Sequence, residues 1–298
     1  MSAPVPVTEA LLRTMPLPTH REGEDKDQRG RILVIGGSPT VPGGAMLAAM
    51  AALRAGAGKL QVATCASIAP HMAVTLPEAL VAGHPETHHG AIAPTEAGAL
   101  AKKASRVDAV VLGPGMMDGG ATAKLVSRLL RKLEGEARLV ADAAALAGLE
   151  TGEDRPRHLA GRMVLTPHAG EMSRLMGEDR DAILADPLAA ARRCAAAHQA
   201  VVIMKGGCSF IATPQGLAWS SGQGNVGLAT SGSGDALAGI IGGLLARGAS
   251  PADAAVWGCF LHGEAGNRLA RRMGPVGFLA RELAAEVPAI MAELAPTA

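Results

Sequence analysis

The stretch "GNVGLATSGSGDALAGIIGGLLARG", residues 224–248, joins a run of small residues to an apolar helical pattern, with one carboxylate at the junction. After Asp235, apolar residues recur at intervals of three and four, the spacing of one buried helix face. They are Leu237, Ile240, Ile241, Leu244 and Leu245. Gly248 is typical of a helix C-terminus. The pattern therefore predicts a helix that begins near Asp235 and ends close to Gly248.

The four residues before Asp235, Ser-Gly-Ser-Gly at 231–234, predict a turn that carries few side-chain atoms. Its N–H groups would join the unpaired N–H groups of the first helical turn and form a cradle for an anion. Gly232, Ser233 and Gly234 are the candidate anion hole. Ser and Asp also cap helices, and Gly is common in turns. This stretch alone leaves phosphate binding and simple capping open.

Composition predicts a globular protein with a core of small and aliphatic side chains. The chain has 298 residues, of which 48% are hydrophobic, yet it holds only 2 Trp, 3 Phe and no Tyr. Such a chain can bury a sizeable core, built from Ala, Leu, Val, Ile and Met. Recognition of bases by stacking on aromatic rings is not expected.

Charge, cysteine and hydropathy patterns exclude further classes. A net charge of +1 without a long Lys/Arg run argues against a nucleic-acid partner. The cysteines lie far apart and form no C-x-x-C pair: Cys65, Cys194, Cys208 and Cys259. Reduced thiols in a cytoplasmic protein are expected, rather than disulfides or a metal site. No apolar run approaches a membrane span, and two charged residues within positions 1–15 disfavour a signal peptide.

Strand and helix patterns alternate along the chain. Apolar, β-rich runs occur at 31–37, 59–64, 109–115, 137–142, 163–168 and 200–207, and helical patterns at 44–58, 119–133, 169–176 and 186–199. This alternation predicts an α/β fold with a mostly parallel sheet covered on both faces. The runs "SFIATPQG" and "LAWSS" follow with too short a link for a crossover, so we expect an antiparallel edge.

Chemically distinctive residues stand at the C-terminal end of each predicted strand. They are Gly36-Gly37, Gly113-Pro114-Gly115, Asp142, Thr166-Pro167-His168 and Lys205-Gly206-Gly207. In open α/β sheets, ligands bind outside the carboxyl ends of the strands. We therefore expect these separate segments to meet at one rim.

Each rim residue has an ordinary structural interpretation beside the functional one. Lys205 is either a solvated lysine or a phosphate ligand. His168 is either a helix cap or a ligand contact, and Asp142 either a cap or a contact to a hydroxyl or metal-bound water. Asp235, beside bare N–H groups, is expected to stay ionised and act as a modest base. Phosphoryl transfer needs little more than positioning and charge stabilisation, so the pattern favours a kinase-like site.

Several of these segments together resemble the ADP-dependent NAD(P)H-hydrate dehydratase family of the ribokinase-like superfamily, over about residues 25–270. They read "GRILVIGGS", "GGAMLAAMAALRAGAG", "VLGPG", "VLTPHAGE", "VVIMKGG" and "GNVGLATSGSGDALAGIIGGLLA". The resemblance implies a three-layer α/β/α fold and a single domain over 1–298, with 1–25 as a loose N-terminal extension. It also implies repair of hydrated NADH or NADPH, with ADP as phosphate donor.

The resemblance implies site residues by position. Hydrate contacts are Ala45, Gly115, His168 and Asp235, with Asp235 as the catalytic base. Nucleotide contacts are Lys205, Gly206, Gly207, Cys208, Ser209 and Gly234. It further implies a need for Mg²⁺, a homotetramer and functional pairing with a separate NAD(P)H-hydrate epimerase. Two alternatives remain: a thiazole-kinase type alcohol kinase of the same superfamily, and a non-catalytic nucleotide sensor.

Overall fold

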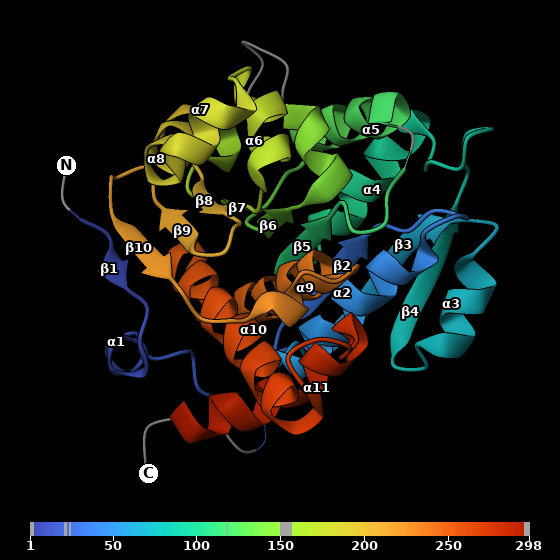
Figure 1. Ribbon diagram of the computed structural model, residues 1–298. Coiled ribbons are helices and arrows are strands. Elements are labelled where there is room, and N and C mark those ends of the chain that lie inside the picture. Colours follow the sequence, from blue (N-terminus) through green and yellow to red (C-terminus); the bar gives the residue numbers. More distant parts are fainter. Residues whose placement is uncertain (1–2, 21–22, 24, 118, 150–156, 295–298) are drawn as a thin grey trace.

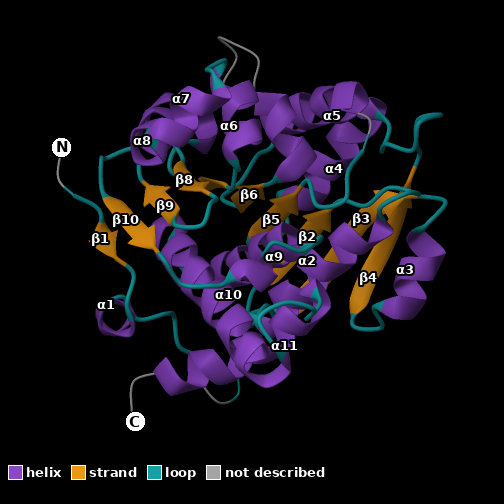
Figure 2. Cartoon of the chain, viewed as in Figure 1, coloured by secondary structure: helices purple, strands orange, loops and turns teal. Residues whose placement is uncertain are grey.

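A computed structural model describes residues 3–20, 23, 25–117, 119–149 and 157–294. Its strands are β1 (Val5–Pro6), β2 (Arg31–Ile35), β3 (Lys59–Cys65), β4 (Ala79–His84), β5 (Ala109–Leu112), β6 (Arg138–Ala141), β7 (Met163–Leu165), β8 (Val201–Met204), β9 (Ser209–Ala212) and β10 (Ala218–Ser221). They form one sheet in the order β1-β10-β9-β8-β7-β6-β5-β2-β3-β4. Only β9 runs antiparallel to its neighbours among these strands. The predicted mostly parallel sheet with an antiparallel pair near one edge is confirmed (Figure 2).

Helices cover both faces of the sheet. The α-helices are α1 (Glu9–Thr14), α2 (Pro42–Arg54), α3 (Ala69–Thr75), α4 (Ala97–Ala104), α5 (Gly119–Lys132), α6 (Ala169–Met176), α7 (Arg180–Ala185), α8 (Pro187–His198), α9 (Ser233–Ala246), α10 (Pro251–Met273) and α11 (Ala280–Leu294). Short 3₁₀ helices are η1 (Pro94–Glu96), η2 (Ala143–Leu149), η3 (Arg157–Leu159) and η4 (Val226–Leu228). Figure 1 shows α4 to α8 above the sheet and α2, α9, α10 and α11 below it. No helix in the described ranges is long and apolar enough to cross a membrane.

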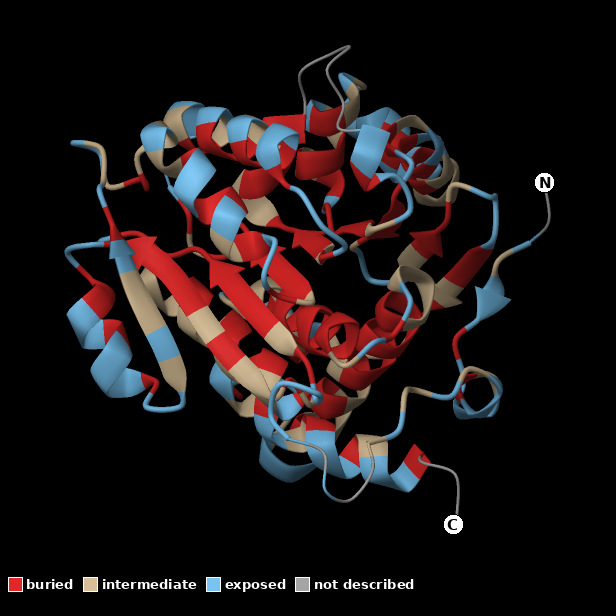
Figure 3. Ribbon diagram, turned by 180° about the vertical axis from the view of Figure 1, so that it is seen from behind, coloured by how far each residue is buried: buried red, intermediate tan, exposed pale blue. Residues whose placement is uncertain are grey.

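The core is dense because small residues let backbones approach closely. A Cβ added to Gly239 of α9 would lie 2.2 Å from the carbonyl oxygen of Ala48 in α2, and one added to Gly243 would lie 2.4 Å from that of Ala52. Figure 3 shows the central strands and the inward helix faces as buried. Cys65, Cys194 and Cys259 are buried and Cys208 is exposed, and among the described residues none of the four forms a disulfide.

The N-terminal segment differs from the expected loose extension. β1 pairs with β10 in parallel, and the side chains of Val7 and Leu12 are buried. The indole Nε1 of Trp257 donates a hydrogen bond to the carbonyl of Met15 at 2.7 Å. The expectation of a loose segment was wrong for residues 3–20, because hydrophobic contacts and a strand pairing fix them; residues 1–2, 21–22 and 24 lie outside the described residues.

The strand order changes direction between β2 and β5. From β2 the chain adds β3 and β4 on one side, and from β5 it adds β6, β7 and β8 on the other. Parallel strands end in register here, since Ile35 lies opposite Leu112, and Leu112 opposite Ala141. Ligand crevices in open α/β sheets lie at such a switch point. The loops after β2 and β5 meet there, with the Gly37 N–H donating to the Pro114 carbonyl at 2.8 Å.

Candidate active site

The N-terminus of α9 presents unpaired backbone donors. Gly232 is its N-cap, with φ +87°, and the helix begins at Ser233, two residues before the predicted start. The N–H of Ser233 donates to the carbonyl of Thr230 at 3.2 Å, so the prediction that this N–H belongs to an anion hole was wrong. Within the described ranges, the N–H groups of Gly232, Gly234 and Asp235 have no hydrogen-bond partner. The helix dipole and these donors favour an anion.

Asp235 lies in the first turn of α9 and does not cap it, because its side chain makes no capping hydrogen bond. Its carboxylate accepts a hydrogen bond from the backbone N–H of Gly115, in the loop after β5. Burial, followed by the charge of Asp142, raises the pKa of Asp235 to about 6, although Lys205 and the Gly115 N–H act in the opposite direction. Desolvation outweighs the helix terminus and shifts the pKa of Asp235 upward, but with a pKa of about 6 the carboxyl is still mostly ionised at pH 7, as expected for a modest base.

Lys205 lies beside the turn of residues 231–234, which we call the anion-binding turn. Its Nζ donates to Asp142 Oδ1 at 2.8 Å and lies 3.7 Å from Glu171 Oε2. Burial lowers the pKa of Lys205, but Asp142 and Glu171 oppose this, and the net direction is upward. A Cβ added to Gly234 would lie 3.5 Å from Nζ, so the ammonium adjoins the free N–H groups. A solvated lysine does not fit this geometry.

Asp142 is buried and anchors this ammonium. Its Oδ1 accepts from the Thr166 hydroxyl at 2.5 Å as well as from Lys205. Sequence reasoning left Asp142 between capping and a ligand contact; the structure shows it as the ion-pair partner of a strand-end lysine. Thr166 and Glu171 were quoted within predicted motifs without a role, because which side chains turn toward a common point depends on the strand register.

His168 serves as the N-cap of α6. Its Nδ1 accepts from the N–H groups of Gly170 at 3.0 Å and Glu171 at 3.2 Å, and Glu171 Oε2 accepts from the His168 N–H at 2.8 Å. This reciprocal pattern is a capping box. The ring is 56% exposed and borders the cavity described next. Capping and ligand contact are therefore compatible here.

A cavity of about 880 Å³ lies over the carboxyl ends of β6, β7 and β8 and the N-terminus of α9. The predicted site residues that line it are His168, Lys205, Gly206, Gly207, Ser209, Ser233, Gly234 and Asp235. Its size is in the range of cofactor and nucleotide sites. Sequence reasoning missed His262 and Asn225, which also line it; neither stands in a predicted strand-end motif.

The other predicted site residues are Ala45, Gly115, Cys208 and Gly232, and they do not line this cavity. Ala45 and Gly115 adjoin each other, since a Cβ added to Gly115 would lie 3.4 Å from the Ala45 nitrogen. Gly115 in turn bonds Asp235. Asp235 therefore stands between the large cavity and the Gly115 loop.

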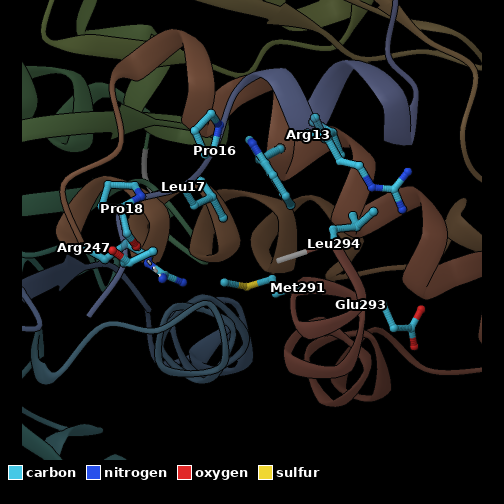
Figure 4. A pocket seen from close by; sticks show the side chains of 11 residues that line it. Arg13, Pro16, Leu17, Pro18, Arg247, Met291, Glu293 and Leu294 are labelled. Carbon is cyan, nitrogen blue, oxygen red and sulfur yellow. Dashed lines mark hydrogen bonds between the residues drawn. The ribbon is translucent and has the colours of Figure 1, made fainter. Parts of the chain in front are cut away.

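A second cavity, of about 360 Å³, lies between the N-terminal segment and α11. Figure 4 shows side chains of residues 16–18 on one side of it and of α11 on the other. Arg247 Nη2 donates to a carbonyl of that loop at 2.8 Å, and Glu293 pairs with Arg268. These polar groups are engaged in holding the loop and helices, so this cavity is not the candidate active site.

The geometry of the larger site indicates its chemistry. Unpaired helix N–H groups and a neighbouring ammonium stabilise a phosphoryl group, and a carboxylate of raised pKa beside them accepts a proton from the attacking hydroxyl. Fold and site together indicate an enzyme of the phosphoryl-transfer class, with its anion-binding site at the carboxyl ends of the sheet strands.

Comparison with known proteins gives the family. The family model for NAD(P)H-hydrate dehydratase matches residues 32–289, and the chain belongs to this family. It is 51% identical to the ADP-dependent (S)-NAD(P)H-hydrate dehydratase of Xanthomonas campestris over 97% of this chain and 96% of that protein. It is also similar to the bifunctional NAD(P)H-hydrate repair enzyme Nnr of Moorella thermoacetica, at 38% identity, and spans 54% of that longer protein.

Solved structures agree with this assignment. The ADP/ATP-dependent NAD(P)H-hydrate dehydratase of Bacillus subtilis, co-crystallised with ATP and Mg²⁺, matches with a TM-score of 0.81 at 29% identity. The match covers 99% of each chain. The expected ribokinase-like three-layer architecture is thereby confirmed.

Proposed function

We propose that this protein dehydrates the (S)-hydrates of NADH and NADPH at the expense of ADP, and releases NADH or NADPH, AMP and phosphate. The observation that carries the proposal is the placement of Asp235, half-buried between the Gly115 N–H and the anion-binding turn, with Lys205 close by. The names of the Xanthomonas and Bacillus relatives support the same reaction.

The chemistry explains why a phosphoryl-transfer site suits a dehydration. Hydroxide is a poor leaving group, whereas phosphate is a good one. Asp235 accepts the proton of the hydrate's hydroxyl as that oxygen bonds to the terminal phosphorus of ADP, and AMP leaves. The lone pair of the ring nitrogen then expels phosphate by cleavage of the carbon–oxygen bond, which leaves an iminium ion. Loss of a proton from the adjacent ring carbon restores the carbon–carbon double bond.

We propose that the hydrate and the nucleotide each contact a different set of residues around the Asp235 carboxylate. We assign the hydrate to Ala45, Gly115, His168 and Asp235, because the Gly115 loop adjoins the Asp235 carboxylate and His168 lines the same cavity as Asp235. We assign the nucleotide to Gly234 and to the loop that contains Lys205, Gly206, Gly207, Cys208 and Ser209. The Lys205 ammonium, next to Gly234, would stabilise charge on the transferred phosphoryl group.

We propose that magnesium binds at this site together with the nucleotide. Among the described residues there is no group of three or more His, Cys, Asp or Glu side chains suited to hold a metal ion. Mg²⁺ commonly binds through one or two carboxylates together with substrate phosphates and water. We propose Asp142, which lines the cavity, as the nearby carboxylate; when bound, the ion would neutralise phosphate charge.

We further propose that the protein assembles as a homotetramer and works alongside a separate epimerase, as the family resemblance implies. The chain spans about half the length of the bifunctional NAD(P)H-hydrate repair enzyme Nnr from Moorella thermoacetica, and the name of that relative supports a functional link to a second repair activity. Light scattering of the purified protein tests the oligomer, with a mass of about four chains expected and a monomer contradicting it.

The direct test uses purified protein, a chemically prepared hydrate, Mg²⁺ and either ADP or ATP. Reduced cofactor, AMP and phosphate should form in equal amounts with ADP. Consumption of nucleotide without recovery of NAD(P)H, or rapid phosphorylation of a thiazole alcohol, would favour the alcohol-kinase alternative. Binding of nucleotide with no turnover of any substrate would favour the sensor.

A further inference from the structure

His262 lies on α10 and reaches the first residue of α9 across the helix pair. Its Nε2 is 2.9 Å from the hydroxyl oxygen of Ser233 and 3.1 Å from the Ser233 carbonyl oxygen. Both residues line the large cavity. The single atom Nε2 of His262 thus contacts two oxygen atoms of Ser233, which lies in the anion-binding turn. This places His262 to control how Ser233 meets a ligand.

The imidazole is neutral at physiological pH. Burial lowers the pKa of His262 to about 4, assisted by the charge of Lys205 and opposed by the hydrogen bond to the Ser233 carbonyl. A neutral imidazole carries one N–H, on either Nδ1 or Nε2. The carbonyl oxygen of Ser233 accepts hydrogen bonds only, so the contact at 3.1 Å requires the proton on Nε2.

This tautomer fixes the role of the serine hydroxyl. Because Nε2 carries a proton, the Ser233 oxygen can only accept from it, and the hydroxyl hydrogen is left for another acceptor. Among the described residues, the Ser233 hydroxyl has no other hydrogen-bond partner. The hydroxyl hydrogen is thus available to a ligand in the cavity that Ser233 lines.

The serine backbone shows why a hydroxyl donor matters at this position. The Ser233 N–H is engaged by the Thr230 carbonyl, while those of Gly232, Gly234 and Asp235 are free among the described residues. Residue 233 therefore offers no backbone donor to an anion. A side-chain donor at the same position restores a continuous set of donors along the turn.

We propose that His262 is a positioning residue that donates its Nε2–H to Ser233 and thereby keeps the Ser233 hydroxyl as a hydrogen-bond donor to the phosphoryl group. The proposal rests on the proposed function, because the phosphoryl group is that of ADP. His262 itself does not touch the reacting atoms; it acts through Ser233.

Four variants test the proposal: Ser233→Ala, His262→Leu, His262→Gln and the double variant Ser233→Ala with His262→Leu. Loss of one phosphate donor should lower kcat by about 10- to 100-fold, at or below the effect of a main oxyanion donor. His262→Leu should match Ser233→Ala, and the double variant should fall no further. His262→Gln, whose amide N–H can occupy the position of Nε2, should recover most of the rate.

If the loss of kcat in the double variant equals the product of the two single-variant losses, the proposal is overturned. A folded His262→Leu variant with a normal kcat and only a lower melting temperature would also overturn it. Dehydration by the wild-type protein is the control for the proposed function. If the wild type fails to turn over, the proposed function fails and a second measurement still decides the inference.

That measurement is ¹⁵N NMR of the histidine rings, with the His262→Gln spectrum used to assign the His262 signals. A neutral ring protonated at Nε2 between pH 6 and pH 8 is expected. Protonation at Nδ1 would contradict the proposal whatever the enzyme's activity. Inorganic phosphate as probe should bind more weakly to Ser233→Ala than to wild type by calorimetry, and equal affinity would also contradict it.

Discussion

Asp235 is a carboxyl group that the folded protein holds in an unfavourable environment for its charge. Desolvation raises its pKa to about 6, and Asp142 and Glu171 add repulsion. A base of this pKa is half deprotonated near pH 6 and still retains appreciable proton affinity at pH 7. The arrangement reduces stability at neutral pH in return for a better proton acceptor.

Replacing Asp235 by Asn keeps the shape of the side chain and removes the base. We expect turnover to fall by about 10²- to 10⁴-fold, the usual effect of a positioned base. Folding should be retained, because the N-cap of α9 is Gly232 and Asp235 makes no capping bond. Turnover and circular dichroism of the variant check this; near-normal turnover in a folded variant would remove Asp235 from the mechanism.

The pH dependence of stability follows from the same shift. Because the folded pKa of Asp235 is raised from 3.8 to about 6, its favourable contribution is fully present below about pH 4 and is lost as pH rises through 6. Asp235→Asn should therefore be more stable than wild type above pH 6, by up to about 3 kcal/mol, with the difference vanishing near pH 4.

Urea unfolding of both proteins across this pH range measures the difference. The variant should show its largest advantage at pH 7 to 8. An advantage that grows toward acid pH would mean that the pKa of Asp235 is lowered in the folded state. In the wild type, kcat/KM should also decline below about pH 6 as the base becomes protonated.

The sequence identified the important side chains of the site better than it predicted their pKa shifts and contacts. Asp235 and Lys205 were recognisable because they stand at a helix start and a strand end. The pKa direction of Asp235 was not, because burial depends on the packing of α2, α9 and the Gly115 loop. His262 carried no local signal, since its contact to Ser233 joins residues 29 positions apart.

Helix α9 positions the site through its packing on α2. Gly239→Ala would place a methyl group 2.2 Å from the Ala48 carbonyl oxygen, so the helices must separate. We expect a loss of about 1–3 kcal/mol in unfolding free energy, together with lower activity because the anion-binding turn moves with α9. Gly98→Ala in α4 is the matched control, since its added Cβ meets only Lys132 Nζ, at 3.8 Å.

Thermal unfolding of the two glycine variants checks this prediction. Gly98→Ala should be neutral or stabilising by up to about 1 kcal/mol, because alanine loses less conformational entropy than glycine in a helix and Gly98 lies in the first turn of α4. Equal melting temperatures for Gly239→Ala and wild type would show that α9 and α2 can adjust without cost. If Gly239→Ala loses activity without a change in stability, the activity depends on the position of the anion-binding turn and not on the stability of the α2–α9 packing.

The strands and helices that flank the site motifs were predicted, whereas α4, α10 and α11 were not, although α10 is long and largely buried. The strands that end at the site read as apolar runs because both faces are covered. β4 and α3 were missed, since β4 at the sheet edge is mostly half-buried or exposed and α3 spans only seven residues. β1 has two residues, too few for any pattern, and pairs with β10 through tertiary contacts.

The N-terminal segment contributes to the stability of the molecule as a whole. Leu12 is fully buried, whereas Val5 is 48% exposed. Leu12→Ala should lower the unfolding free energy by about 2–5 kcal/mol, and Val5→Ala, as the control, by much less. Urea unfolding measures both; indistinguishable midpoints would mean that residues 3–20 are loosely attached after all.

At the scale of the whole molecule, the proposed activity requires that the hydrate's hydroxyl oxygen be phosphorylated and leave on phosphate. The decisive measurement uses hydrate labelled with ¹⁸O at that hydroxyl, turned over with unlabelled ADP, followed by mass spectrometry of the products. One ¹⁸O atom should appear in each inorganic phosphate released. Unlabelled phosphate, with the ¹⁸O recovered in water, would contradict the transfer of a phosphoryl group to the hydrate.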